Sequence, residues 1–421
     1  MTRRDLLGAA VVAGPVLVAA EARAAERKRM AIVCTEWRPR SHAQHMGDRF
    51  LVGYPKDAAW RKPELDVVSV YVDQHPESDL SRIREKEFGF KIYPTIAETL
   101  RCGGSRLAVD AVLIIGEHGR YPRTEYGQVQ YPRYQFFKQV SDVFRQDGKV
   151  TPVFNDKHLS WNWDWAAEMV GIARQLKIPF MAGSSLPHTW RMPALDIPDG
   201  AEVEEVLGVA EGGVDSYDFH ALEMMQTLIE RRQGGETGVA WVDAARGDAV
   251  WKRQDAGGWT DGGWGASLFE ACLSRSQTLE QPRASQGFNH RYPTPAEIRT
   301  LVKAPVAYRY QHRDGVKATM LLMNGLVNDF TVAVKLKGRD KPLATLFYLP
   351  PLPNVQYSAM LMSRVEELFL SGKATLPIER TLLTTGLVAA CVRSLHEGKR
   401  LDTSHLDVRY RAPKRSRYGE G

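Results

Sequence analysis

Residues 110–119 read DAVLIIGEHG, an apolar run followed at once by a glycine and two titratable side chains. A short apolar run that ends in a polar turn is typical of a strand buried on both faces of a sheet. Helical stretches at 95–101 and 164–176 separate further runs of this kind, which lie at 30–34, 66–72, 151–154 and 179–183. This alternation predicts an α/β fold with a Rossmann-like, doubly wound parallel sheet.

The pattern changes after about residue 187. Alternating apolar and polar residues there predict strands at 203–210, 238–242, 319–323, 330–336 and 344–349. Helices are predicted at 218–232, 360–370 and 379–396. Residues 246–316 are rich in glycine, tryptophan, arginine and proline, a composition typical of long functional loops. The second half is therefore predicted to be an α+β domain with a mostly antiparallel open sheet.

A chain of 421 residues is too long for one compact core, which favours two domains. We expect four segments along the chain: an export signal at 1–24, a Rossmann nucleotide-binding-like domain at 29–187, an α+β substrate and oligomerisation domain at 188–410, and a flexible basic tail at 411–421.

The amino terminus predicts export. Arg3 and Arg4 precede a modest apolar stretch at 6–20, and Ala22-Arg23-Ala24 forms a small-x-small cleavage pattern. Together they resemble a twin-arginine-type signal, which predicts a periplasmic or extracellular protein. The apolar stretch is too short for stable membrane insertion. The formal charge of +6 is spread along the chain, so no nucleic-acid partner is expected.

Polar and titratable residues follow nearly every predicted strand of the first half. In an open parallel sheet, ligands bind outside the carboxyl ends of the strands, so these residues are expected to form one cleft. The stretches are residues 35–45 (TEWRPRSHAQH), 73–75 (DQH), 116–119 (GEHG), 155–158 (NDKH) and 184–188 (SSLPH).

Several motifs together resemble the glucose–fructose oxidoreductase, inositol dehydrogenase and rhizopine-catabolism (Gfo/Idh/MocA) family. They are 87–95 (EFGFKIYPT), 109–115 (VDAVLII), 152–159 (PVFNDKHL), 212–213 (GG), 218–223 (DFHALE), 379–386 (ERTLLTTG) and 394–398 (SLHEG). The resemblance covers most of the predicted mature chain. It implies an NAD(P)-dependent oxidoreductase that acts on a small-molecule carbohydrate. It also implies a possible homo-oligomer, because such proteins pair through the open sheet of the second domain.

The resemblance implies roles for matching residues. Lys157 corresponds to the family's motif lysine beside the nicotinamide, and His220 corresponds to a proton-transferring histidine, so the expected catalytic residues are Lys157, His220 and Asp218. NAD or NADP is expected at Thr35, Arg38, Ser41, His42, Asp73, Glu117 and His118. Substrate is expected at Asp156, His158, His188, Trp190 and Arg191. Asp73 would accept hydrogen bonds from the adenosine ribose or be an ordinary turn residue, and Lys157 has an alternative role in an ion pair with Asp156 or Asp218.

The first strand–helix turn departs from the family pattern. A GxGxxG sequence there lets the backbone approach a pyrophosphate, but residues 34–42 (CTEWRPRSH) contain no glycine. Trp37 and Pro39 are expected to fill the space that phosphates need, while Arg38 and Arg40 supply compensating charge.

Two other functions fit parts of the sequence. His42, His45 and the other strand-end histidines and carboxylates would suit a metal-dependent hydrolase or lyase, although they lack a fixed ligand spacing and no metal is expected. A non-catalytic carbohydrate-binding protein would instead stack sugar rings on its tryptophans, which are Trp161, Trp163, Trp165, Trp190, Trp259 and Trp264.

Overall fold

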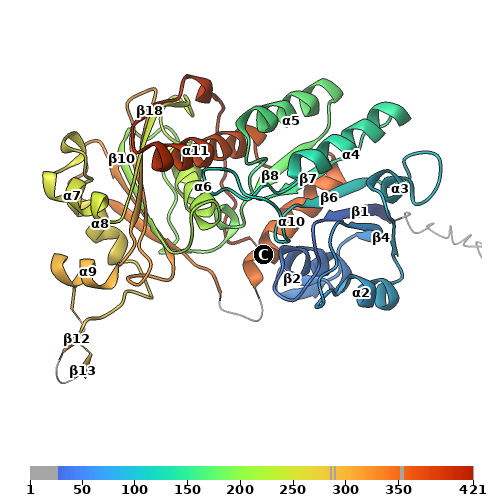
Figure 1. The fold of residues 1–421 in the computed structure, drawn as a ribbon, viewed down its shortest axis with the longest axis horizontal. Coiled ribbons are helices and arrows are strands. Elements are labelled where there is room, and N and C mark those ends of the chain that lie inside the picture. Colours follow the sequence, from blue (N-terminus) through green and yellow to red (C-terminus); the bar gives the residue numbers. More distant parts are fainter. Residues whose placement is uncertain (1–26, 285–286, 289–290, 351–354, 421) are drawn as a thin grey trace, which may run out of the picture.

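The computed structural model describes residues 27–284, 287–288, 291–350 and 355–420, so the predicted export signal lies outside the described residues. The first half of the chain forms a six-stranded parallel sheet in the order β5-β4-β1-β6-β7-β8 (Figure 1). Its strands are β1 (Lys28–Cys34), β4 (Leu65–Val72), β5 (Lys91–Ile92), β6 (Ala111–Ile115), β7 (Val153–Asp156) and β8 (Phe180–Gly183). A small hairpin, β2 (Tyr54–Lys56) and β3 (Ala59–Arg61), stands beside it.

Continuous apolar strands form this sheet because both of its faces are covered. Along β1, Ala31 and Val33 join one apolar core, while Met30 and Ile32 join a separate core on the opposite face. The first face is covered by α3 (Ile96–Arg101), α4 (Arg133–Asp147) and α5 (Trp163–Leu176). The second is covered by η1 (Ala43–Gly47), α1 (Asp48–Val52), α2 (Ser81–Phe88) and α10 (Gln356–Ser371). Helix α10 thus returns from the second half of the chain to cover the first sheet.

The second half forms an eight-stranded sheet in the order β18-β11-β14-β15-β10-β16-β17-β9, in which only β10 and β15 pair in parallel among the described residues. Its strands are β9 (Arg191–Met192), β10 (Val203–Ala210), β11 (Val239–Arg246), β14 (Val306–His312), β15 (Lys317–Leu322), β16 (Phe330–Leu336), β17 (Leu343–Phe347) and β18 (Leu401–Asp402). A further pair, β12 (Arg283–Ala284) and β13 (Gly287–Phe288), is separate. The predicted fold class is therefore confirmed.

Helices also cover both faces of the second sheet. On the face toward the first sheet lie α6 (Tyr217–Ile229) and α11 (Ile378–Glu397), with η2 (Leu186–His188) and η4 (Ser404–Leu406) nearby. On the outer side lie α7 (Asp248–Ala256), η3 (Trp259–Asp261), α8 (Ala266–Leu273) and α9 (Pro295–Leu301). Helix α11 packs against both α5 and β11, and it joins the two halves (Figure 1). Among the described residues no helix is both long and apolar enough to cross a bilayer.

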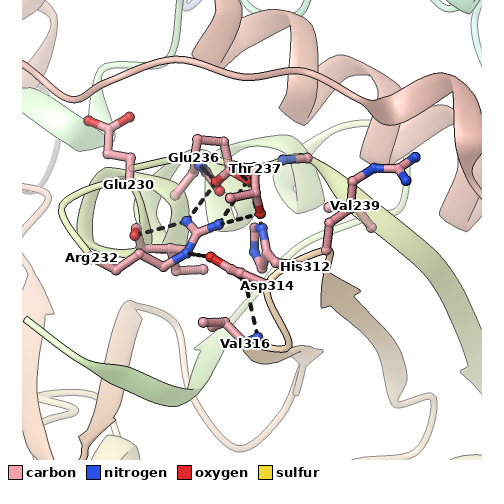
Figure 2. Close-up of polar contacts among 12 residues, drawn as sticks. Glu230, Arg232, Glu236, Thr237, Val239, His312, Asp314 and Val316 are labelled. Atoms are coloured by element: carbon pink, nitrogen blue, oxygen red, sulfur yellow. Dashed lines mark hydrogen bonds and ion pairs between the residues drawn. The ribbon is translucent and has the colours of Figure 1, made fainter. Parts of the chain in front are cut away.

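A buried charged network ties the end of α6 to β14 (Figure 2). The Glu236 carboxylate accepts hydrogen bonds from Arg232 at 2.9 and 3.1 Å and pairs with the His312 ring at 2.9 Å. The backbone N–H groups of Thr237 and Gly238 donate to the same carboxylate, each at 2.8 Å. The side chains of Arg232, Glu236 and His312 are all buried. Removing any one of these side chains is therefore expected to weaken the whole network, because the buried charges of Arg232 and Glu236 compensate each other.

Two regions differ from expectation. Residues 246–316, predicted as loops, contain α7, α8, α9 and the full-length strand β14. The end of the chain, expected to be a flexible basic tail, makes several side-chain and backbone contacts with the rest of the protein. Arg417 pairs with Glu367 at 2.9 Å, Ser416 donates to Asp196 at 2.6 Å, and the Gly419 N–H donates to a carbonyl at 2.9 Å. Carboxylates from distant elements thus fix the path of this segment.

Candidate functional site

A cavity of about 440 Å³ lies where the carboxyl ends of β1, β6, β7 and β8 face α6 and α10. Titratable side chains from the loops after these strands, together with His220 of α6, line this cavity: Arg40, His42, His45, Glu117, His118, Asp156, Lys157 and His220. Tyr217, Phe330 and Tyr357 supply aromatic walls from the second half of the chain. The cavity therefore combines polar groups that can orient a small molecule with apolar walls that exclude water.

Lys157 enters the cavity directly after β7. Its backbone is in the left-handed region, with φ of 63°, and its N–H donates to the carbonyl of Gly183 at 3.2 Å. The ammonium lies 3.2 Å from Glu117 Oε1, and the other oxygen of Glu117 pairs with Arg133. Burial opposes ionisation of Glu117, but these two cations hold its pKa well below the usual range. Lys157 thus pairs with Glu117, rather than with Asp156 or Asp218.

A second pair joins two strand ends across the cavity. His42 Nδ1 lies 2.6 Å from Asp156 Oδ2, and the carboxylate is 1% exposed. A carboxylate at Nδ1 orients the ring with its proton on Nδ1, which leaves a lone pair on Nε2. His118 packs edge-on against the His42 ring, and burial, with His42 acting in the same direction, lowers the pKa of His118 to about 4. His118 is therefore neutral near pH 7.

His220 belongs to a third arrangement. The Leu186 N–H donates to Ser184 Oγ at 3.1 Å, and Ser184 Oγ lies 2.6 Å from His220 Nδ1. The serine hydroxyl still has its own proton and a second lone pair, and when it donates to Nδ1 the imidazole proton stands on Nε2. Burial, followed by the charge of Lys157, lowers the pKa of His220 well below its usual value. In that tautomer the neutral ring presents a hydrogen-bond donor at Nε2.

Glu223 lies behind Ser184. One carboxylate oxygen accepts from the Thr384 hydroxyl at 2.6 Å, and the other lies 3.5 Å from the Ser184 N–H. Burial raises the pKa of Glu223 to about 7, even though the nearby Arg380 acts in the opposite direction. Any side chain at Gly183 would place its Cβ 2.9 Å from this carboxylate, so the sequence keeps glycine at the end of β8.

Asp218, expected to be catalytic, is not brought to the cavity. It is fully buried, and its carboxylate accepts hydrogen bonds from the backbone N–H groups of Asp215, Ser216 and Phe219. The Tyr308 hydroxyl donates to the same carboxylate at 2.9 Å. Asp218 therefore stabilises the start of α6 and fixes the position of His220 indirectly.

Of the residues expected to bind the cofactor, His42, Glu117 and His118 line the cavity. The others contact neighbouring loops. Thr35 is buried and donates to the Glu117 carbonyl at 2.6 Å. Ser41 Oγ accepts from the N–H groups of Arg38 and Gln44 at 3.2 and 3.3 Å, and Arg38 pairs with Glu36.

Of the two bulky residues expected to fill the first turn, Trp37 is buried and Pro39 is exposed. Trp37 is fully buried, stacks on Phe90 and donates through its indole N–H to Asp48 at 3.2 Å. A Cβ added to Gly47 would lie 3.0 Å from the Trp37 ring, so the following helix packs directly on this indole.

A clasp, formed by residues 119–121 on residues 73–74, joins the loops that follow β6 and β4, the strands on either side of β1. The Tyr121 hydroxyl donates to Asp73 at 2.7 Å. Gln74 exchanges two hydrogen bonds with the backbone of Arg120, at 2.9 and 3.1 Å. Asp73 also accepts from the Tyr71 hydroxyl at 2.8 Å. Asp73, which was expected to accept hydrogen bonds from an adenosine ribose, thus already accepts hydrogen bonds from two tyrosines.

The residues expected to bind substrate fall into two groups. Asp156 lines the cavity, and His158 is buried behind it, 3.1 Å from Arg133. His188, Trp190 and Arg191 do not line the cavity. Arg191 lies between the rings of Phe347 and Tyr418, and it pairs with Asp196 at 3.1 Å. These three residues instead hold the end of the chain.

Sequence reasoning missed Tyr217, Tyr357 and Arg133. Tyr217 adjoins the DFHALE motif, which was a usable signal, whereas Tyr357 begins α10 and has no local motif. The tryptophans proposed as sugar platforms do not line the cavity. Trp165, for example, stacks on Tyr134, and Trp264 is buried. Within the described part of the chain no three His, Cys, Asp or Glu residues are grouped to hold a metal ion.

The fold matches solved dehydrogenases. GenD2 from gentamicin A biosynthesis, solved in complex with NAD, is 12% identical with a TM-score of 0.56, covering 90% of this chain and 96% of its own. Scyllo-inositol dehydrogenase from Lactobacillus casei is 11% identical with a TM-score of 0.53, covering 90% and 98%. Myo-inositol 2-dehydrogenase from Lactobacillus plantarum is 12% identical with a TM-score of 0.52, covering 90% and 99%.

No protein-family model and no curated protein sequence matches the chain. The expected resemblance to the Gfo/Idh/MocA type is confirmed for the fold, because the matching structures share both domains over almost their whole length. These comparisons show the fold, and the function depends on the side chains of the cavity.

Proposed function

We propose that the chain is an oxidoreductase of the NAD(P)-dependent type that acts on a hydroxyl or carbonyl group of a small polyhydroxylated molecule, such as a sugar or an inositol. The observation that carries this proposal is the convergence of Lys157, His220 and the His42–Asp156 pair on one cavity at the strand ends. The similarity of the fold to GenD2 and to two inositol dehydrogenases supports the substrate class.

The side chains divide the chemistry between them. His42, oriented by Asp156, has its lone pair free to accept the proton of a substrate hydroxyl. The Lys157 ammonium donates a hydrogen bond to the same oxygen and stabilises the negative charge that develops there. His220 donates from Nε2 to a neighbouring oxygen of the substrate and so fixes the orientation of the substrate ring. A nicotinamide cofactor, when bound, would accept or supply the hydride.

The fit to a dinucleotide differs between its two ends. The cavity wall formed by Glu117, His118 and Lys157 fits the reacting end of the cofactor. The first turn does not fit a pyrophosphate in the glycine-rich manner, because Ser41 already accepts the turn's own N–H groups and Trp37 fills the space behind them. No step of the proposed chemistry depends on contacts to that turn.

This filled turn also favours a second candidate, a redox-neutral acid–base enzyme such as an isomerase or a lyase. A base at His42 and a donor at His220 can move a proton on a hydroxylated substrate without a hydride acceptor. The two candidates use the same cavity and differ in whether a dinucleotide is present.

Small molecules released from the purified protein distinguish the two candidates. Protein prepared without added cofactor is denatured, and the supernatant is analysed by mass spectrometry. No free pool of cofactor exists outside the cytoplasm, so an NAD(P)-dependent enzyme that functions there has to keep its cofactor bound. We therefore expect close to one NAD(H) or NADP(H) per chain. Absence of both, together with no dinucleotide binding in calorimetric titration, would reject the oxidoreductase and favour the redox-neutral enzyme.

We also propose that the folded protein is exported through its twin-arginine-type signal. In a host that has this pathway, replacing Arg3 and Arg4 by lysine should shift the full-length protein from the periplasmic to the cytoplasmic fraction. The matched control replaces Arg27 and Lys28, which follow the signal, by alanine and should leave export unchanged. Equal periplasmic recovery of the Arg3→Lys, Arg4→Lys variant would exclude this route.

A further inference from the structure

A second cavity, of about 360 Å³, lies between β2, α10 and the end of the chain. Four cationic side chains and two carboxylates line it: Lys56, Arg364, Arg415, Arg417, Asp57 and Glu420. It shares no lining residue with the cavity at the strand ends. Arg364 stands six residues beyond Ser358 on α10, so the two cavities lie about 9 Å apart along this helix.

The cavity carries an excess of positive charge. Glu420 pairs with Arg364, Arg415 and Arg417 at distances of 2.8 to 3.3 Å. Two residues of opposite charge, Glu367 and Arg61, lie just outside the lining. Glu367 pairs with Arg364 and Arg417, and Arg61 pairs with Asp57. The lining therefore has four cations against two carboxylates, and although each arginine has a carboxylate partner, Lys56 has none among the described residues.

Two cations of the lining have unused donors. Lys56 makes no side-chain hydrogen bond or ion pair with the described residues. Arg364 is 3% exposed, and its Nε–H has no hydrogen-bond partner among them. A buried guanidinium N–H without a partner costs free energy, so a ligand that accepts from it would gain that interaction.

Further unpartnered donors lie behind the cavity wall. His188, whose carbonyl accepts from the Gly419 N–H at 2.9 Å, is buried with neither ring nitrogen hydrogen-bonded. Arg191 and Arg380 are also buried, and each has at least one N–H group without a partner. Burial, followed by the charges of Arg380 and Arg364, lowers the pKa of His188 well below its usual value. The protein thus maintains an electropositive interior beneath this wall.

We propose that this cavity binds a phosphoryl dianion, which displaces the Glu420 carboxylate from the three arginines. With Glu420 displaced, the three arginines and Lys56 face only Asp57 within the lining, and a dianion with several acceptor oxygens meets this positive charge and the free donors of Lys56 and Arg364. In the described structure Glu420 occupies the place of that anion. The site is independent of the proposed enzymatic function, since no residue of the catalytic cavity takes part.

Calorimetric titration of the full chain with inorganic phosphate tests the proposal, at constant ionic strength and with chloride as the reference anion. We expect saturable one-to-one binding with a Kd on the order of 0.1–1 mM. Lys56→Ala should weaken binding at least tenfold without changing the thermal midpoint in phosphate-free buffer, because Lys56 has no partner to lose. The matched control Lys341→Ala, at an exposed lysine elsewhere, should bind as the wild type does.

A second variant distinguishes a ligand site from a purely structural cluster. Glu420→Gln removes the internal competitor and should tighten phosphate binding several-fold. If the arginines serve only to anchor the end of the chain, the variant instead lowers the thermal midpoint and phosphate does not bind. Absence of saturable binding to the wild type, or equal binding to the Lys56→Ala variant, would overturn the proposal.

Discussion

Replacing Glu236 by glutamine is expected to lower the free energy of unfolding at pH 7 by about 3–5 kcal/mol, as for other broken buried ion networks. The carboxylate is surrounded by Arg232, His312 and two backbone N–H groups, and all of the side chains are buried. Glutamine has the same shape but no charge, so the Arg232 guanidinium loses its buried counter-ion. Urea unfolding followed by circular dichroism measures the change.

The effect on stability should depend on pH in a defined direction. Burial opposes ionisation of Glu236, but His312 and Arg232 hold its pKa below the usual value. A lowered pKa in the folded state adds stability above the ordinary glutamate pKa of about 4.3, and this contribution disappears as the pH falls below it. The difference between wild type and Glu236→Gln should therefore narrow on acidification. Glu397→Gln, in an exposed pair with Arg393, is the control and should change little.

Replacing Lys157 by methionine is expected to reduce kcat/KM about 10²–10³-fold, the usual loss when one charge-stabilising donor is removed from a site. The ammonium is the group that both contacts Glu117 and lines the cavity. The measurement is steady-state turnover across a panel of inositols and aldoses with NAD⁺ and NADP⁺. Unchanged kcat/KM on the best substrate of the panel would exclude the assigned role.

Two further variants separate catalysis from folding. Lys177→Met is the matched control, because Lys177 has the same left-handed backbone, with φ of 57°, and is exposed at the end of α5. It should retain full activity. Lys157→Arg keeps a cation beside Glu117, so its thermal midpoint should match that of the wild type while its activity still falls. A loss of activity that simply follows a loss of folded protein would contradict a direct role for Lys157.

The strands of the first sheet and one helix start could be predicted because their signals are local. Each strand is a continuous apolar run, and Thr95 accepts from the Glu98 N–H at the start of α3 as its spacing predicts. The helices α7, α8 and α9 could not be predicted, since they have seven to nine residues and are stabilised by packing on the second sheet.

The residues of the candidate site also fall into those with a local sequence signal and those without one. Lys157, His42 and Glu117 follow strands, so the rule that ligands bind at the carboxyl ends of a parallel sheet places them together. Asp218 and Arg191 were assigned to the site because neither motif nor spacing reveals their partners. The partner of Asp218 is Tyr308, which lies 90 residues away in the sequence. The partner of Arg191 is Tyr418, which lies near the end of the chain. Such long-range contacts decide whether a polar residue is free to meet a ligand.

The return of α10 to the first sheet has a consequence for how the protein folds during synthesis. Leu361, Val365 and Phe369 of this helix pack on the face of the sheet that includes Met30 and Ile32. Until the ribosome has released α10, that face is covered only by η1, α1 and α2, and the growing chain exposes the remaining apolar surface to other molecules. The two halves are thus completed together, late in synthesis, and a segment ending near residue 187 would emerge as an aggregation-prone intermediate rather than as an independent unit.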